Sequence, residues 1–162
     1  MTHAERKIRF AIITCSDTRA LTEDDAGYAL EELIRSRSWE VASHVIVKDD
    51  VSQISQAIVD ATDGLGVDVV LTCGGSGLSP RDVTPEATRA VCERDVPGIA
   101  EGMRAHSIKI TPFAMLSRAV CMQRGTCIVI NLPGSTKAAT ENWEAIEGVL
   151  PHAASMMARE GH

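Results

Sequence analysis

Residues 67–86 read VDVVLTCGGSGLSPRDVTPE, a stretch that combines a short apolar run, a glycine-rich segment and a helix start. Val67–Thr72 has the length and composition of a buried strand. The following Cys73–Pro80 contains three glycines, which predicts a loop. Pro85 fits the first turn of a helix, with Thr84 as the expected N-cap. A strand that passes through a loop into a helix is the repeating unit of α/β proteins.

The same alternation continues on both sides of this stretch. Ile8–Thr14 and Val41–Val47 are predicted strands, and Thr126–Leu132 is a clear late strand. Apolar spacing predicts helices over about 25–37, from Val51 to a stop at Asp63–Gly64, around Ala100–Ser107, and over about 137–158. The expected buried side of the last helix consists of Ala145, Ile146, Val149, Ala153 and Met156. This order predicts a parallel sheet covered by helices on both faces.

Length and composition limit the possible functions. The 162 residues suggest one domain spanning 1–162, and 16 Lys and Arg against 22 Asp and Glu give a net charge of −6. This balance and an aromatic content of 3% argue against a nucleic-acid surface. The chain shows neither a run long enough to cross a membrane nor a signal-peptide pattern. Five cysteines without a CxxC pair fit a reduced, cytoplasmic protein, with Cys15, Cys73 and Cys127 as buried apolar residues.

Polar residues follow the predicted strands where each one ends. In open parallel sheets these carboxyl ends meet at one edge, where ligands bind. The first strand leads to a polar loop and the second to carboxylates. The third and the late strand each lead to a glycine loop. The residues gathered there include Thr14, Ser16, Asp17, Asp25, Lys48, Asp49, Gly74, Gly75, Ser76, Gly77, Arg81, Asp82, Pro133, Gly134, Ser135 and Lys137.

This set predicts metal-assisted phosphate chemistry. Glycine loops and helix N-termini bind anions, whereas carboxylates repel them unless a cation such as Mg²⁺ lies between. Each signal alone has a structural alternative: the loop lacks the spacing of a Walker A or GxGxxG motif, and Asp49 and Asp50 could cap a helix. The prediction therefore depends on the convergence of the strand ends. The five histidines read as surface or packing residues.

Leu71–Glu86 (LTCGGSGLSPRDVTPE) resembles the signature of the MogA/MoaB family of molybdenum-cofactor biosynthesis proteins. Further segments match in the same order, so that the resemblance covers about residues 8–155. These segments are IITCSD at 12–17, RDVPG at 94–98, MLSRA at 115–119 and NLPGSTK at 131–137. The resemblance implies a three-layer α/β/α sandwich with a mostly parallel central sheet, like other molybdopterin-binding folds.

The resemblance also implies a reaction, the transfer of AMP from Mg·ATP to the terminal phosphate of molybdopterin with release of pyrophosphate. Asp49 and Asp82 match the two acidic catalytic positions of the family and are the expected Mg²⁺ ligands. Gly74–Gly77 match the loop that holds substrate phosphate, and Ser135 lies in the second loop. Thr14, Ser16, Asp17 and Asp25 would line the pterin and nucleotide side, while Arg81 and Lys137 could add positive charge.

Two alternatives to this enzyme stay open. The segment GSTKAATENW at 134–143 resembles MoaB-type members, which suggests a catalytically silent molybdopterin-binding or carrier protein. An unrelated phosphosugar or nucleotide enzyme on a similar sheet is the other. The resemblance further implies a homotrimer or a hexamer and allows for a molybdenum insertase as partner. The apolar stretch 97–124 is the candidate subunit contact.

Overall fold

The fold is built on a six-stranded sheet in the order β2-β1-β3-β6-β5-β4, as shown by a computed structural model that describes residues 7–158. The polar start of the chain, His3 and His162 lie outside this range. The three pairs that join β2, β1, β3 and β6 are parallel, whereas β5 is antiparallel to β6 and to β4. The strands are β1 Arg9–Cys15, β2 Glu40–Val47, β3 Val69–Cys73, β4 Arg94–Asp95, β5 Cys121–Arg124 and β6 Cys127–Leu132.

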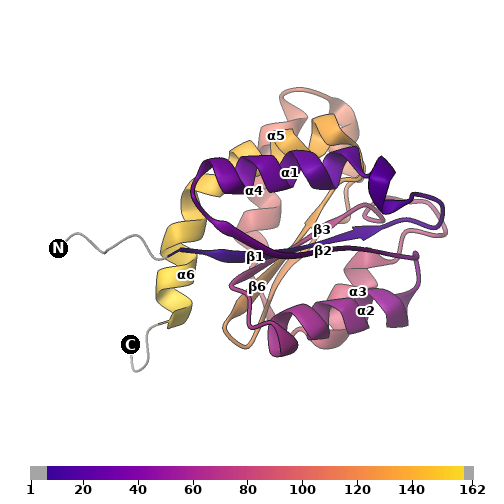
Figure 1. Cartoon of the computed structure of the whole chain (residues 1–162). Helices are drawn as coiled ribbons and strands as arrows, with labels where there is room; N and C mark the ends of the chain where they lie inside the picture. Colours follow the sequence, from indigo (N-terminus) through magenta and orange to yellow (C-terminus); the bar gives the residue numbers. More distant parts are fainter. Residues whose placement is uncertain (1–6, 159–162) are drawn as a thin grey trace.

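Helices cover both faces of the sheet, which confirms the predicted three-layer α/β/α sandwich (Figure 1). On one face lie α1, α4 and α5, and on the other lie α2 and α3. Short η segments, mostly 3₁₀-helical, connect several of these elements. The bounds are η1 Leu21–Glu23, α1 Asp25–Ser36, α2 Val51–Val59, η2 Asp60–Gly64, α3 Thr84–Val91, α4 Pro97–Ile108, η3 Pro112–Leu116, α5 Thr136–Ile146, η4 Glu147–Val149 and α6 Leu150–Ala158.

Each face of the sheet has its own apolar core. Phe10 and Ile12 of β1 pack in one cluster with Leu30 of α1 and Trp143 of α5. The alternate residues of β1, such as Ile13, pack in the other cluster with α2 and α3. Because successive side chains of a strand point to opposite faces, the continuous apolar run of β1 supplies both cores. Cys15, Cys73 and Cys127 are buried in these clusters, as expected.

The structure corrects the start of α3. Thr84 is the first helical residue and Val83 occupies the N-cap position, so the predicted N-cap was wrong. The hydroxyl of Thr84 instead donates a hydrogen bond of 2.9 Å to the carbonyl of Gly74. The third strand's loop is thereby tied to the helix that follows it. Pro85 does lie in the first turn, as predicted.

The structure also corrects the last helix. The predicted helix over 137–158 is divided into α5 and α6 by η4, which rotates the apolar face. Val149 and Met156 are therefore exposed, although the periodicity placed them on the buried side. Ile146 is buried as predicted, and its buried neighbours are Ala139, Trp143, Leu150 and Ala154. The helical run after Val51 does end at Gly64, but its last turn is π-helical.

The region from Pro97 to Arg124 contains α4, η3 and β5. Of these, only α4 was predicted. Strands β4 and β5 are too short to give a pattern of alternation, because they have two and four residues. Among the described residues, no helix is both long and apolar enough to cross a membrane.

Candidate functional site

The carboxyl ends of β1, β3 and β6 approach one another so closely that only glycine fits between them. Gly74 has a φ of +96°, and a Cβ atom there would lie 2.7 Å from the carbonyl oxygen of Cys15. A Cβ atom on Gly134 would lie 3.2 Å from the Cα of Gly74. The two glycine loops thus pack backbone against backbone, as the convergence of the strand ends predicts.

The loop after β3 also brings Asp49 close to its backbone. Gly75 has a φ of +70°, and a Cβ atom on it would lie 3.2 Å from Oδ1 of Asp49 and 2.4 Å from the hydroxyl oxygen of Thr84. Asp49 comes from the segment between β2 and α2. The structure therefore places one predicted acidic residue directly against the predicted phosphate loop.

One oxygen of Asp49 is buried without a partner. Among the described residues Oδ1 has no hydrogen-bond partner, whereas Oδ2 accepts a hydrogen bond of 3.1 Å from the backbone N–H of Asp17. Burial raises the pKa of Asp49, and the nearby charges of Asp17 and Asp82 raise it further. An unpaired buried oxygen is unfavourable in the free protein, and a cation bound there would provide the missing interaction.

Asp82 holds the glycine loop together. Its Oδ2 accepts hydrogen bonds of 3.2 Å from the backbone N–H groups of both Gly77 and Ser79. A Cβ atom on Gly77 would lie 3.0 Å from this oxygen, so the loop closes tightly around the carboxylate. The second predicted acidic residue therefore has a positioning task within the loop.

Asp17 and Arg81 form a bidentate ion pair across this edge of the sheet. The Nε and Nη2 atoms of Arg81 each donate a hydrogen bond of 2.9 Å to the carboxylate of Asp17. The hydrogen bonds from Arg81 hold the pKa of Asp17 below its ordinary range. Arg81 was expected to supply positive charge to a phosphate, and in the structure that charge is already paired.

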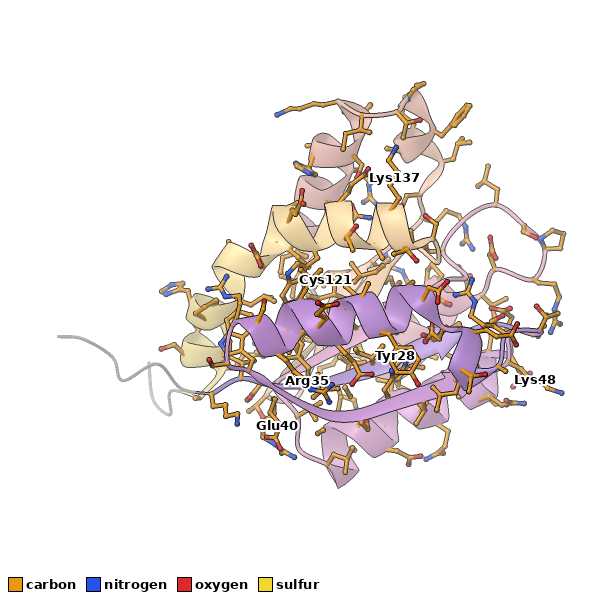
Figure 2. All side chains as sticks on the ribbon, turned by 45° about the horizontal axis from the view of Figure 1, so that its top comes forward. Tyr28, Arg35, Glu40, Lys48, Cys121 and Lys137 are labelled. Carbon is orange, nitrogen blue, oxygen red and sulfur yellow. The ribbon has the colours of Figure 1, made fainter. Side chains whose placement is uncertain are left out.

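The remaining predicted residues differ in how they are placed. The hydroxyl of the fully buried Thr14 donates a hydrogen bond to Asp24, and that of Ser16 accepts bonds from the loop backbone. Ser135 is the N-cap of α5, where it accepts a hydrogen bond from Ala138. Lys137 is 82% exposed, with Glu141 at 4.0 Å (Figure 2). Asp25 is exposed at the start of α1, and Pro133 is half-buried beside Gly134.

A cavity of about 410 Å³ lies beside the two glycine loops. Its walls include all four residues of Gly74–Gly77, together with Asp82, Pro133 and Gly134. The opposite walls come from α4, η3 and α5, and residues of these elements were not predicted as site residues. They include Met103, Arg104, Ser107, Phe113 and Asn142. A pocket of this size, largely apolar with a polar loop at one side, suits an organic ligand that carries an anionic group.

Arg118 is a further residue that the sequence interpretation did not single out. Its guanidinium donates hydrogen bonds of 2.6 Å and 2.7 Å to the carbonyls of Gly77 and Asp82, and one of 2.7 Å to Glu86. Its backbone N–H donates to the carbonyl of Ser76. Arg118 thus holds the second half of the predicted phosphate loop from outside. Two sequence signals pointed to it: it is the one charged residue in the stretch 114–120, and it lies in the MLSRA segment at 115–119 that matches the family.

The donor set limits how a metal ion can bind. Within residues 7–158, no group of three or more His, Cys, Asp or Glu side chains could enclose a metal ion. The site offers Asp49 with its unpaired oxygen and Asp82 across the same loop. Mg²⁺ is commonly held by one or two carboxylates together with substrate phosphates, and this pair fits that mode.

The comparisons of this chain with a family model and with known proteins agree with one another. The family described as "Probable molybdopterin binding domain" matches residues 11–152. The chain is 41% identical to molybdenum cofactor biosynthesis protein B of Bacillus cereus over 137 residues, covering 83% of this chain and 81% of that protein. It is 33% identical to the molybdopterin adenylyltransferase of Helicobacter pylori over 154 residues, covering 93% and 88% of the two chains.

Two further likenesses extend the comparison. The chain is 38% identical over 154 residues to the molybdenum cofactor synthesis protein cinnamon of Drosophila melanogaster, but it spans only 26% of that longer protein. The crystal structure of the molybdopterin biosynthesis enzyme MoaB from Thermus thermophilus superposes with a TM-score of 0.85 at 42% identity, covering 93% of this chain and 96% of that one.

Proposed function

This chain belongs to the family of probable molybdopterin-binding domains, and on that basis we propose that it is a molybdopterin adenylyltransferase of molybdenum-cofactor biosynthesis. It transfers AMP from Mg·ATP to the terminal phosphate of molybdopterin and releases pyrophosphate. The observation that carries this proposal is the buried, unpaired Oδ1 of Asp49 beside the Gly74–Gly77 loop. An acceptor for a cation and a loop for a phosphate stand next to each other there.

The reaction brings two groups of negative charge together, so positioning and charge neutralisation are the main requirements. Backbone N–H groups of the glycine loop orient the attacking phosphate, apart from those of Gly74 and Gly77, which donate to Leu132 and Asp82. Asp82 and Arg118 keep that loop in one conformation from its two sides. A phosphate monoester has lost most of its second proton near neutral pH, so no side chain has to act as a strong base.

Asp49 and Asp82 would hold Mg²⁺, with the substrate phosphates as further ligands. When bound, the ion neutralises charge on the α-phosphate and on the leaving pyrophosphate. The fit of these residues rests on the unpaired oxygen of Asp49 and on the positions of both carboxylates at one loop. Arg81 is paired with Asp17, so its contribution to phosphate binding requires that pair to open or to share its donors.

A catalytically silent molybdopterin-binding protein is the second candidate. The specific observation that favours it is the higher identity to the Bacillus protein B, 41%, than to the Helicobacter adenylyltransferase, 33%. The presence of both Asp49 and Asp82 in the geometry described above favours the enzyme.

The deciding experiment incubates the purified protein with molybdopterin and Mg·ATP and follows adenylyl-molybdopterin by mass spectrometry. We expect the product to form in the unmodified protein, and to be lost both on chelation of Mg²⁺ and in Asp82→Asn. Tight binding of molybdopterin without any adenylate would establish the silent alternative. Binding of other phosphorylated compounds in place of molybdopterin would contradict both.

The cellular setting is part of the same proposal. We infer a cytoplasmic protein that acts as one domain on small-molecule substrates, as a homotrimer or a pair of trimers, and hands its product to a molybdenum insertase. The support is the acidic composition, the family membership and the exposed apolar side chains of η3, namely Phe113, Met115 and Leu116.

A further inference from the structure

Beneath the phosphate-binding edge lies a buried histidine between two carboxylates. The side chain of His44 of β2 is 7% exposed, and its Nε2 and Nδ1 atoms lie 2.6 Å from Oδ2 of Asp24 and 2.7 Å from Oε2 of Glu31. The side chains of Asp24 and Glu31 are 0% and 10% exposed. The sequence interpretation treated His44 as a surface or packing residue, and neither description covers this arrangement.

The surroundings of His44 are built closely around it. A Cβ atom on Gly27 would lie 2.4 Å from Nε2 of His44 and 2.2 Å from Oδ2 of Asp24, so glycine is required there. The ring of Tyr28 meets the imidazole edge to face, with 5.0 Å between the ring centroids. Tyr28, Glu31 and Asp24 are the titratable groups that face His44 from α1 and from the residue preceding it.

The geometry determines the charge of the imidazole. A neutral histidine has one N–H donor and one acceptor nitrogen, and an acceptor cannot bond to an ionised carboxylate. Carboxylates at both nitrogens are therefore matched only by the doubly protonated imidazolium. Burial by itself would lower the pKa of His44, but the hydrogen bonds with Asp24 and Glu31 outweigh it and leave that pKa raised.

The network continues from Asp24 to the site. The other carboxylate oxygen of Asp24, Oδ1, lies 3.5 Å from Nη1 of Arg19. The same Nη1 atom donates a hydrogen bond of 3.4 Å to the carbonyl of Gly134 in the second glycine loop. At the far end, Arg35 lies 2.9 Å from Glu31. Charges therefore alternate in sign from Arg35 to Arg19, and the chain of contacts ends at the glycine loop.

We propose that His44 is a positioning residue: its imidazolium fixes Asp24, and Asp24 holds the guanidinium of Arg19 at the Gly134 loop as the cation that receives substrate phosphate. This inference rests on the proposed function, because it assigns the source of positive charge at that site. Arg81 is bound bidentately by Asp17, whereas Arg19 meets Asp24 only at 3.5 Å. Arg19 is therefore the more available of the two cations.

The first test reads the charge of His44 without requiring turnover. In the full-length protein labelled with ¹⁵N-histidine, we expect both ring nitrogens of His44 to show the shifts of an imidazolium at pH 7. His44→Gln assigns the signal, and His152→Gln on the exposed face of α6 is the matched control. A neutral tautomer at pH 7 would overturn the inference.

The second test measures the dissociation constants for Mg·ATP and for molybdopterin by calorimetry, with kcat beside them. In His44→Gln, the dissociation constant of the ligand that contacts Arg19 should rise about tenfold, as for the loss of one charge-assisted hydrogen bond, while kcat changes less. His44→Lys retains a cation and should restore most of the affinity. In this variant the pH at which the affinity falls should be higher than in the unmodified protein, since an ordinary lysine has a pKa of ~10.4.

A double-mutant cycle identifies the route through Arg19. If His44 acts through Arg19, adding His44→Gln to Arg19→Ala should weaken binding no further. Additive losses, or unchanged affinity in His44→Gln, would contradict the inference while leaving the proposed function intact. An unmodified protein that binds neither substrate would overturn the proposed function and this inference together. Should His44→Gln fail to fold, the histidine shifts and the Arg19→Ala and His44→Lys variants still decide.

Discussion

Asp49 and Asp50 are neighbours with the same side chain and different tasks. Oδ1 of Asp49 is buried without a partner beside Gly75, while Asp50 is the N-cap of α2 and accepts a hydrogen bond of 3.0 Å from the N–H of Gln53. The residue pattern alone allowed a capping role for both, and the family resemblance assigned the catalytic role to Asp49. The difference arises because the extended backbone between β2 and α2 turns successive side chains in different directions.

Asp49→Asn and Asp50→Asn form a matched pair at the residue scale. Asp49→Asn should lower the rate of adenylylation about 100-fold, because a neutral amide oxygen cannot neutralise the charge of a cation. The stability of the protein should be maintained, since the repulsion of residue 49 by Asp17 and Asp82 is removed. Asp50→Asn should leave activity and stability unchanged, since asparagine caps helices as well as aspartate. Steady-state rates and urea unfolding measure both; equal activity losses would contradict the assignment.

The Asp24–His44 pair predicts how stability depends on pH. Burial opposes ionisation of Asp24, but hydrogen bonds from His44, Thr14 and Gly27 hold its folded pKa below 3.8, so its contribution is lost as pH falls through that lower value. The folded pKa of His44 is above 6.5, so its contribution is complete below about 6.5 and is lost as pH rises through the higher value.

The free energy of unfolding should therefore reach a plateau between about pH 4 and 6.5. Urea denaturation across pH 3 to 9 measures it. In His44→Gln the alkaline decline from this residue should disappear and the plateau should be lower, whereas His152→Gln should keep the original profile. An unchanged alkaline decline in His44→Gln would show that another group causes it.

At the scale of elements, the loop between β3 and α3 is held from three sides. Asp82 binds its N–H groups, Thr84 binds the carbonyl of Gly74, and Arg118 binds the carbonyls of Gly77 and Asp82 from the segment after η3. A loop with positive φ at Gly74 and Gly75 would otherwise sample many conformations. These bonds preorganise the loop, which favours the anion binding that we propose for it.

Arg118→Ala tests this clamp. We expect a loss of roughly 2 kcal/mol in stability, limited by the partial exposure of the ion pair with Glu86, and weaker binding of the substrate phosphate. Arg118→Lys should lose almost as much stability and substrate binding, because one ammonium group cannot span two carbonyls and a carboxylate. Arg89→Ala, which removes only an exposed pair with Asp95, is the control and should cost less than about 1 kcal/mol. Substrate binding and thermal unfolding report the outcome.

At the scale of the whole molecule, α4 and η3 form an apolar projection. Ile108, Ile110, Phe113, Met115 and Leu116 are all exposed, with Phe113 at 75%. Several exposed large apolar residues within nine positions favour an interface with other chains. This surface lies within the stretch 97–124, the expected subunit contact, and it adjoins the cavity because Phe113 and Leu116 also line it.

Phe113→Asp tests whether this surface joins subunits. Light scattering should give three or six times the 17.4 kDa of one chain for the unmodified protein, and a lower mass for the variant with its circular dichroism unchanged. Leu65→Asp, at an exposed leucine after η2, is the control and should keep the original mass. A mass of 17.4 kDa for the unmodified protein would contradict the proposed oligomer.

The sequence by itself determined the order of most elements, both glycine loops and the edge of the sheet at which the candidate site lies. Those features follow from local rules: the period of apolar residues, the turn chemistry of glycine and proline, and the geometry of parallel strands. Local rules failed where an element was too short to show a period, as in β4 and β5, or where a 3₁₀ turn rotated a helix, as in η4.

Only the tertiary structure decided which polar groups are paired. Arg81 binds Asp17 across 64 residues, Arg19 reaches Gly134 across 115, and His44 lies between Asp24 and Glu31. Such partners are set by how the helices and loops pack on the sheet, and no sequence spacing encodes them. The same packing left one oxygen of Asp49 unpaired, so the net charge of −6, which excludes a broad nucleic-acid surface, is compatible with a local phosphate site.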